Sequence, residues 1–172
     1  SDFHPSLAQT GRRMRFSQLT HLECSRCQRE FQADQLINLC PDCSSPLLAR
    51  YDLQGAARQM HQGDVLTRAK GMWRWHELLP VQNPEAIVTL GEGDTPMIKL
   101  PHLGNDLGLS DLILKDESLN PTGTFKARGQ AAAISRAKEL GAQRVIIPTA
   151  GNAGGAMAAY AARAGMQARV VM

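Results

Sequence analysis

One lysine stands where its amine could act as a nucleophile. Lys126 follows a turn-forming Pro-Thr-Gly segment (residues 121–123) and opens a stretch, residues 125–140, whose apolar positions repeat with helical spacing. The positive end of a helix dipole disfavours an ammonium group, and partial burial disfavours it further, so we expect an uncharged amine. Such an amine typically forms a Schiff base with a carbonyl, either that of a substrate or that of pyridoxal phosphate. The alternative is an exposed lysine without a chemical role.

A second loop, residues 149–152 (Thr-Ala-Gly-Asn), also follows an apolar run and opens a helical stretch. Ligands of parallel sheets bind at loops that follow the carboxyl ends of strands, so two such loops define a pocket. Backbone N–H groups of residues 150–154 would bind a carboxylate or phosphate, and the Asn152 amide can donate to a phenolate-like oxygen. A dinucleotide-binding fingerprint is incomplete here, because Thr149 occupies the place of its first glycine. A glycine turn with an asparagine cap is the structural alternative.

The cysteines form two C-x-x-C pairs, CSRC (24–27) and CPDC (40–43). Two such turns can complete a tetrahedral zinc site whose ligands would be Cys24, Cys27, Cys40 and Cys43. Four thiolates leave no open coordination position, so we expect a structural metal. Four unligated cysteines are the alternative. Similar zinc ribbons also bind nucleic acids or partner proteins, so this module alone does not define a function.

Strand-like and helix-like segments alternate in the second half of the chain. Branched apolar runs lie at 112–115, 144–148 and 168–172, and helical stretches at 125–140 and 153–164 end at Gly141 and Gly165. This order predicts an α/β fold with right-handed crossovers and a parallel sheet buried on both faces, in three layers. The loops that contain Lys126 and Thr149 would lie at one edge of that sheet.

Four regions differ in composition. We expect a flexible N-terminal tail (1–21), a zinc-ribbon-like module (22–50), a helical connector (51–86) and part of an α/β domain (87–172). The connector contains a short predicted helix at 71–79, whose two tryptophans, Trp73 and Trp75, we expect to act as packing anchors. The chain ends inside the third predicted strand, which suggests that the polypeptide is a fragment.

Charge and hydropathy exclude several classes of protein. The formal net charge of +3 gives no reason to expect a nucleic-acid partner. No apolar run approaches the ~20 residues of a membrane span, and the first residues lack the hydrophobic core of a signal peptide. We therefore expect a cytoplasmic protein without a membrane partner.

Five segments, together with the paired cysteines, occur in the order found in a known family. They are RYDL (50–53), GMWRWHELLP (71–80), LGEGDTPMIKLPHLG (90–104), KDESLNPTGTFKARG (115–129) and PTAGNAGGAMAAYAARAG (148–165). Over residues 22–172 the sequence resembles pyridoxal-phosphate enzymes of fold type II, the tryptophan-synthase-β structural type, and among these the threonine synthases.

This resemblance implies a role for each site residue. Lys126 would hold pyridoxal 5'-phosphate covalently, Asn152 would meet the ring hydroxyl oxygen of the cofactor, and Phe125 would help to shape the site. The loop formed by Thr149, Ala150, Gly151, Asn152 and Ala153 would bind the α-carboxylate of an amino-acid substrate. The implied reaction is that of a lyase in amino-acid biosynthesis, which converts O-phospho-L-homoserine and water into L-threonine and phosphate. The full-length protein would be a homodimer.

One departure from the family pattern leaves a second reaction open. Many threonine synthases have an acidic residue directly after the lysine, where this chain has Ala127. Relatives that eliminate ammonia from serine or threonine vary at this position, so an ammonia-lyase is the alternative enzyme. A zinc-ribbon binding module on a non-catalytic α/β platform is the alternative from another class. Family segments that bind the cofactor phosphate and pyridine nitrogen lie beyond residue 172, so residues 1–172 alone are expected to be inactive.

Overall fold

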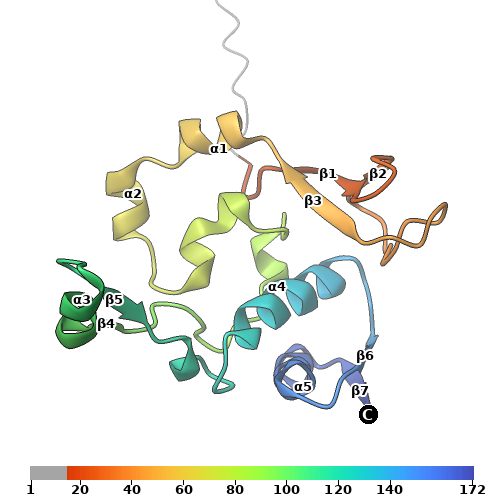
Figure 1. Ribbon diagram of the computed structural model, residues 1–172. Helices are drawn as coiled ribbons and strands as arrows, with labels where there is room; N and C mark the ends of the chain where they lie inside the picture. The colour runs from red at the N-terminus through yellow and green to blue at the C-terminus, as the bar shows by residue number, and fades with distance from the viewer. Residues whose placement is uncertain (1–14) are drawn as a thin grey trace, which may run out of the picture.

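Three antiparallel strands form the N-terminal module. In the computed structural model, which describes residues 15–172, β1 (Leu19–Cys24) lies between β2 (Glu30–Gln32) and β3 (Leu47–Tyr51). One C-x-x-C turn lies between β1 and β2, and the other precedes β3 (Figure 1). The predicted tail lies outside the described residues up to residue 14. Its last part is folded, because Ser17 and Gln18 are buried and β1 begins at Leu19.

The connector consists of four short helices. They are α1 (Leu53–Gln59), α2 (Gln62–Thr67) and the 3₁₀ helices η1 (Met72–Leu78) and η2 (Pro84–Ala86). The helix predicted at 71–79 is therefore present in 3₁₀ form, with non-helical backbone angles at Trp75. Trp73 packs against the core, as predicted, but Trp75 is 46% exposed and does not anchor the segment.

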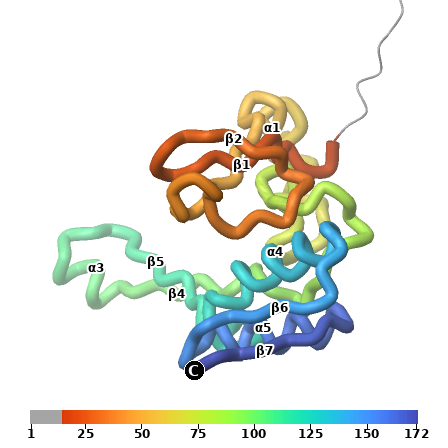
Figure 2. Tube along the Cα trace, turned by 90° about the vertical axis from the view of Figure 1, so that its right-hand side faces the viewer, coloured from red at the N-terminus to blue at the C-terminus, as the bar shows by residue number. Residues whose placement is uncertain are grey.

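Within residues 15–172, the strand predicted at 112–115 does not join the parallel sheet. β5 (Ile113–Lys115) pairs antiparallel with β4 (Met97–Lys99), and α3 (Pro101–Leu107) connects the two strands. This unit extends away from the remainder of the chain (Figure 2). The prediction was wrong because a short apolar run does not specify its pairing partner, and β4 supplies a nearer one.

The remaining elements match the predicted alternation closely. They are α4 (Lys126–Glu139), β6 (Arg144–Pro148), α5 (Asn152–Ala164) and β7 (Gln167–Val171). β6 and β7 are parallel, in a register that runs from Arg144 opposite Gln167 to Pro148 opposite Val171. Gly141 and Gly165 follow the two helices with positive φ angles of 82° and 69°, as glycine stops require.

The core lies where α4 and α5 pack together. Its buried side chains from the two helices are Ala127, Ala131, Ile134, Met157, Tyr160 and Ala161. A Cβ atom at Gly154 would lie 2.9 Å from Val170 Cγ1, so the start of α5 approaches β7 closely. Small residues in α5 thus allow the helix to lie directly on the sheet.

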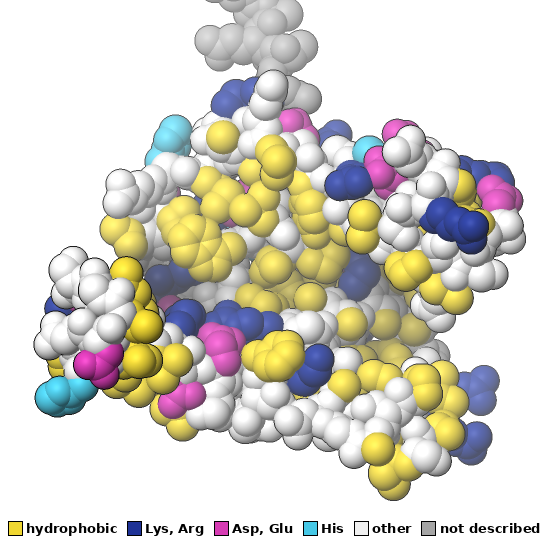
Figure 3. All heavy atoms as spheres, viewed as in Figure 1, with side chains coloured by type: hydrophobic (Ala, Val, Ile, Leu, Met, Phe, Trp, Pro, Cys, Tyr) yellow, Lys and Arg dark blue, Asp and Glu magenta, His cyan; other side chains and the backbone are white. Residues whose placement is uncertain are grey.

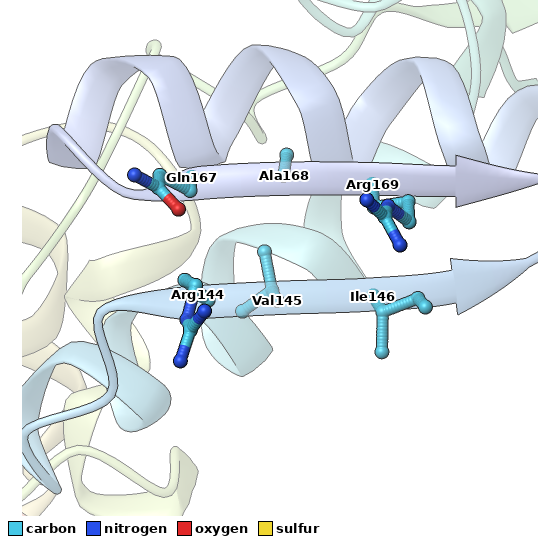
Figure 4. A pocket seen from close by; sticks show the side chains of 6 residues that line it. All are labelled: Arg144, Val145, Ile146, Gln167, Ala168 and Arg169. Carbon is cyan, nitrogen blue, oxygen red and sulfur yellow. The ribbon is translucent and has the colours of Figure 1, made fainter.

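Only one face of the β6–β7 pair is covered within the described residues. Val145 and Ile147 pack toward the core, whereas Ile146 on the opposite face is 65% exposed. Figure 4 shows this open face, which is lined by residues of both strands, among them Arg144 and Arg169. The α/β class is confirmed, but residues 15–172 show two of the three predicted layers and not strands buried on both faces.

Candidate functional site

The start of α4 presents the predicted lysine. The N–H of Gly123, whose φ is 68°, donates to Asn120 O at 2.8 Å, and the Thr124 hydroxyl accepts from Lys126 N at 3.4 Å. Lys126 is exposed, and its Nζ lies 4.5 Å from the centre of the Phe125 ring, which is 58% exposed. The predicted partial burial of the amine is therefore wrong for this part of the chain. The described residues around the turn leave it open to solvent.

A partly buried polar network supports this turn on the side of residues 95 and 117–120. The Arg128 guanidinium forms two hydrogen bonds with the Glu117 carboxylate, at 2.6 Å from Nε and 2.7 Å from Nη2. Thr95 Oγ1 donates to Glu117 at 2.5 Å, and Asn120 Nδ2 donates at 3.0 Å. Chiefly because of Arg128, the pKa of Glu117 is lowered to about 2. Since Arg128 lies two residues after Lys126, the network fixes the first turn of α4.

Glu117→Gln is expected to destabilise the protein in a pH-dependent way. Loss of the charged hydrogen bonds should lower the free energy of unfolding by about 2 kcal/mol at pH 7. The pKa of Glu117 falls from 4.5 to about 2 on folding, so its stabilising effect is complete above pH 4.5 and is lost as the pH falls toward 2. Urea titrations of wild type and variant at pH 7 and pH 3.5 measure the difference, which should be smaller at pH 3.5.

The matched control is Glu85→Gln, because Glu85 is exposed and its side chain makes no ion pair within residues 15–172. It should leave the free energy of unfolding unchanged at both pH values. If Glu117→Gln lowered the free energy of unfolding equally at pH 7 and pH 3.5, the result would contradict an ionised Glu117–Arg128 pair.

The glycine-rich loop at residues 91–95 packs against the lysine turn. Gly93 N–H donates to Asn120 Oδ1 at 3.2 Å. Gly91, Gly93 and Asp94 all have positive φ angles, of 92°, 102° and 48°. A Cβ atom at Gly93 would lie 2.5 Å from Met72 N, so a larger residue does not fit there.

The second predicted loop lies at the start of α5. Gly151 N–H donates to Thr149 Oγ1 at 3.2 Å, and Gly154 N–H donates to Gly151 O at 3.0 Å. The N–H groups of Asn152 and Ala153 belong to the first turn of α5, where a helix provides no acceptor of its own. Asn152 is exposed. These groups can therefore bind an anion, as the sequence predicts.

The two loops lie toward the same end of the β6–β7 pair. Figure 2 shows α4 and α5 both beginning on the side where β6 and β7 end. The helices pack through Ala127 and Met157, so the start of one is fixed relative to the start of the other. Lys126 and Asn152 are thus two exposed polar groups at one end of a rigid helix pair.

The four predicted metal ligands come together in the N-terminal module. Cys24 Sγ lies 3.4 Å from Cys43 Sγ, and Cys27 Sγ lies 3.6 Å from Cys40 Sγ. All four sulfur atoms lie within 4.8 Å of one another, and none is in a disulfide. A tetrahedral zinc site with Zn–S bonds of ~2.3 Å places its sulfur atoms ~3.8 Å apart. The cluster therefore has the size of a zinc site.

Backbone donors also favour the thiolate that a metal would bind. The N–H groups of Cys27 and Arg26 each lie 3.4 Å from Cys24 Sγ. The Cys27 N–H makes the largest contribution, and the pKa of Cys24 is lowered to about 6. Such N–H donors to the first sulfur are typical of zinc-binding turns, because the thiolate is the ligating form.

The cysteine module docks on α4. Arg136 Nη2 donates to Ala33 O, between the two cysteine pairs. The nearby Glu139 Oε1 accepts from the N–H groups of Gln82 and Asn83 in the connector. A hollow between the module and α4 is lined mostly by apolar side chains, among them Leu22 and Ala137 (Figure 3). The helix that begins at the lysine is thus held at its other end by this module.

Sequence reasoning missed the polar groups that support the site. Glu117 was recognised only as part of a longer segment, because no spacing rule pairs it with Thr95, 22 positions away. Glu92 was likewise part of a segment, although its side chain is only 1% exposed. A carboxylate between two glycines is the only signal that the sequence offers there.

Within residues 15–172, each helix is too short or too polar to cross a bilayer.

Residues 88–172 match the family model described as "Pyridoxal-phosphate dependent enzyme". The chain is 36% identical to a threonine synthase of Methanocaldococcus jannaschii over 149 residues, which are 87% of this chain and 36% of that protein. It is 35% identical to a threonine synthase of Methanosarcina acetivorans over 152 residues, with 88% and 36% coverage. It is 47% identical to a threonine synthase of a Synechocystis species over 95 residues, with 55% and 25% coverage.

The chain spans little more than a third of the length of the first two relatives, each covered to 36%. Both similarities extend over the cysteine module as well as the α/β part, since they include at least 87% of this chain. Residues 88–172 therefore belong to the pyridoxal-phosphate dependent enzyme family, and the chain is similar to a partial N-terminal region of threonine synthases.

Proposed function

We propose that the full-length protein is a threonine synthase, which converts O-phospho-L-homoserine and water into L-threonine and phosphate. The observation that carries this proposal is the similarity to threonine synthases over 87% of the chain. The lysine turn and the anion-binding loop at one end of the α4–α5 pair support it. The substrate would be a small amino acid, and no nucleic-acid or membrane partner is needed.

The residues present fit pyridoxal phosphate, although this chain carries only part of what would hold it. Lys126 offers an exposed amine, Phe125 an exposed ring beside it, and Asn152 an exposed amide on the adjacent helix. When bound, the cofactor supplies an electron sink for negative charge at the substrate α-carbon. Lys126 would hold it covalently and Asn152 would donate to its ring hydroxyl oxygen.

The chain's own groups would then bind and orient the substrate. The N–H groups at the start of α5 would bind the α-carboxylate, because they are unpaired within the helix and lie at its positive end. The Lys126 Nζ, once released, would be positioned to remove and return protons at the substrate carbons. Thr149, Ala150, Gly151 and Ala153 would contribute backbone rather than side-chain contacts.

An ammonia-lyase remains the second candidate reaction, but the structure weakens the argument for it. Ala127 is 0% exposed and packs in the core between α4 and α5. The residue after the lysine therefore faces the interior and not the open end of the helix pair. Its departure from the family pattern bears on packing more than on the substrate.

Product analysis of the full-length protein separates the two reactions. With O-phospho-L-homoserine we expect equal amounts of phosphate and threonine, measured by a colorimetric phosphate assay and by chromatography. With threonine or serine alone we expect little keto acid or ammonia. Rapid keto-acid formation without phosphate release from phosphohomoserine would establish the ammonia-lyase instead. A protein inactive with all three compounds and without bound cofactor would support a binding module.

We also propose that the cysteine cluster binds one structural zinc ion and that the full-length protein is a cytoplasmic homodimer. The zinc proposal depends on the sulfur spacing and on the N–H donors at Cys24. The dimer and the compartment depend only on the resemblance to threonine synthases.

A further inference from the structure

Glu92 is a charged residue in the core that the proposed reaction does not use. Its side chain is 1% exposed, and both carboxylate oxygens accept hydrogen bonds. The donors are Trp73 Nε1 at 2.8 Å, Tyr160 OH at 2.6 Å, Leu90 N at 3.1 Å and Thr89 Oγ1 at 3.2 Å. All four donors are neutral groups. A buried carboxylate is costly without such bonds, so this arrangement is specific to a carboxylate.

The donors join three separate segments. Trp73 belongs to η1, Leu90 to the loop before the glycine-rich segment, and Tyr160 to the middle of α5. The Glu92 backbone adds a further link, because its carbonyl accepts from Met72 N–H at 2.9 Å. Glu92 therefore holds η1 and the glycine-rich loop against the helix that begins with the anion-binding loop.

The same loop contacts the lysine turn. Gly93 follows Glu92 directly and donates to Asn120 Oδ1, and Asn120 also donates to Glu117, the partner of Arg128. Asn120 immediately precedes the Pro-Thr-Gly turn that leads to Lys126. The Glu92 side chain thus bonds to Tyr160 in the helix that follows the anion-binding loop, and the adjacent Gly93 bonds to Asn120 just before the lysine turn.

We propose that Glu92 is a positioning residue that fixes the distance between the lysine turn and the anion-binding loop at residues 149–153. This inference rests on the proposed function, because it assigns the two loops to one cofactor and substrate site. Tyr160 acts as a permanent donor to Glu92. Burial, and then the hydrogen bond and charge of Glu92, raise the pKa of Tyr160, so its hydroxyl stays protonated.

Glu92→Gln in the full-length protein tests the proposal. Glutamine keeps the size of the side chain but replaces one acceptor oxygen with an NH₂ group, which would face N–H or O–H donors on either side. We expect kcat with phosphohomoserine to fall by about tenfold or more, and the Kd of pyridoxal phosphate to rise by a similar factor, since small misplacements have effects of this order. Fluorescence titration measures the cofactor Kd independently of turnover.

Ser135→Ala is the matched control. Ser135 is 0% exposed in the same core, and its hydroxyl accepts from Val88 N–H at 2.8 Å, but it lies in the second half of α4, away from both loops. This variant should lower Tm while leaving kcat and the cofactor Kd within about twofold of wild type. A Glu92→Gln variant that is folded and behaves like Ser135→Ala in both readouts would refute a positioning role.

Tyr160→Phe provides a second test that does not depend on Glu92→Gln folding well. Alone, it removes one donor and should raise the cofactor Kd by a few-fold. Combined with Glu92→Gln, it removes a hydroxyl that can donate to the amide oxygen or accept from the amide NH₂, so the double variant should bind the cofactor no more tightly than Glu92→Gln. Tyr160→Phe with unchanged Kd and kcat would overturn the proposal.

The failure of the proposed function would be distinguishable from the failure of this inference. If wild-type protein releases no phosphate from phosphohomoserine, the threonine synthase proposal fails. The cofactor Kd values of the same variants then still decide whether Glu92 positions the two loops.

Discussion

Lys126→Ala in the full-length protein is expected to abolish the covalent attachment of pyridoxal phosphate and nearly all turnover. The amine is the exposed nucleophile at the start of α4. The neighbouring Thr124, which carries a hydroxyl, is only 8% exposed. Loss of both the attachment and the proton transfer should reduce kcat by on the order of 10²–10⁴-fold. The visible absorbance of the purified protein, and the amount of cofactor that survives denaturing dialysis after reduction with borohydride, measure the attachment.

Lys138→Ala is the control for this experiment. Lys138 is an exposed lysine near the end of the same helix. Its replacement by alanine makes the same change in charge and in helix propensity as Lys126→Ala but leaves the lysine turn unchanged. It should leave absorbance and kcat unchanged. Lys126→Arg separates charge from nucleophilicity, because a guanidinium stays protonated and forms no such bond. A Lys126→Ala protein that still carries cofactor resistant to denaturing dialysis after borohydride treatment would assign the attachment to another residue.

The helices and strands next to the candidate site were predictable because local signals agree there. Gly141 and Gly165 have the positive φ angles that glycine stops imply, and β6 begins and ends as its branched apolar run predicts. Such positions depend on backbone sterics and on periodicity, which are local properties of the chain. The two loops that precede α4 and α5 follow from the same signals.

Long-range pairing was not predictable from the same evidence. The apolar run of β5 predicts a strand but carries no information about its pairing partner. Its antiparallel pairing with β4 depends on α3, which connects the two strands. The exposure of Lys126 was missed for a related reason. The position of Lys126 at a helix start implies the electrostatic environment of its amine. Its burial, in contrast, depends on which segments cover the helix start, and these are distant in the sequence.

The supporting carboxylates show the same limit. Glu92 and Glu117 accept hydrogen bonds from residues up to 68 positions away, such as Tyr160. Their sequence neighbours, glycines around Glu92 and polar residues around Glu117, suggest exposed loops, because charged residues in such segments are usually solvated. Only the folded structure shows that both side chains form hydrogen bonds with segments that are distant in the sequence.

Removal of zinc is expected to unfold the cysteine module and weaken the rest of the protein. The module has little other means of stability: β2 has three residues, and the buried apolar side chains between Leu19 and Tyr51 are only Leu19, Cys24, Ala33 and Cys40. Binding of structural zinc in comparable peptides contributes about 10–16 kcal/mol at pH 7. We expect about one zinc per chain by elemental analysis after reducing purification, and a large drop in Tm after chelation.

Variants of single ligands locate this effect. Cys24→Ser and Cys40→Ser should each abolish zinc retention, whereas Ser25→Ala, an exposed change inside the first C-x-x-C turn, should retain it. Zinc content below about half an equivalent in wild type, with no change in Tm on chelation, would show that the cysteines are unligated.

The docking of this module on α4 extends the prediction to the cofactor site. Arg136 loses its acceptor, Ala33 O, when the module unfolds, and the apolar side chains around Ala137 lose their cover. Since α4 is a continuous helix from Lys126 to Glu139, increased motion at its C-terminal end also displaces the lysine turn at its start. Chelation should therefore raise the cofactor Kd several-fold at temperatures where the α/β part stays folded. Arg136→Met should reproduce part of this rise with zinc still bound, and an unchanged Kd in both cases would show that the module and the site are energetically independent.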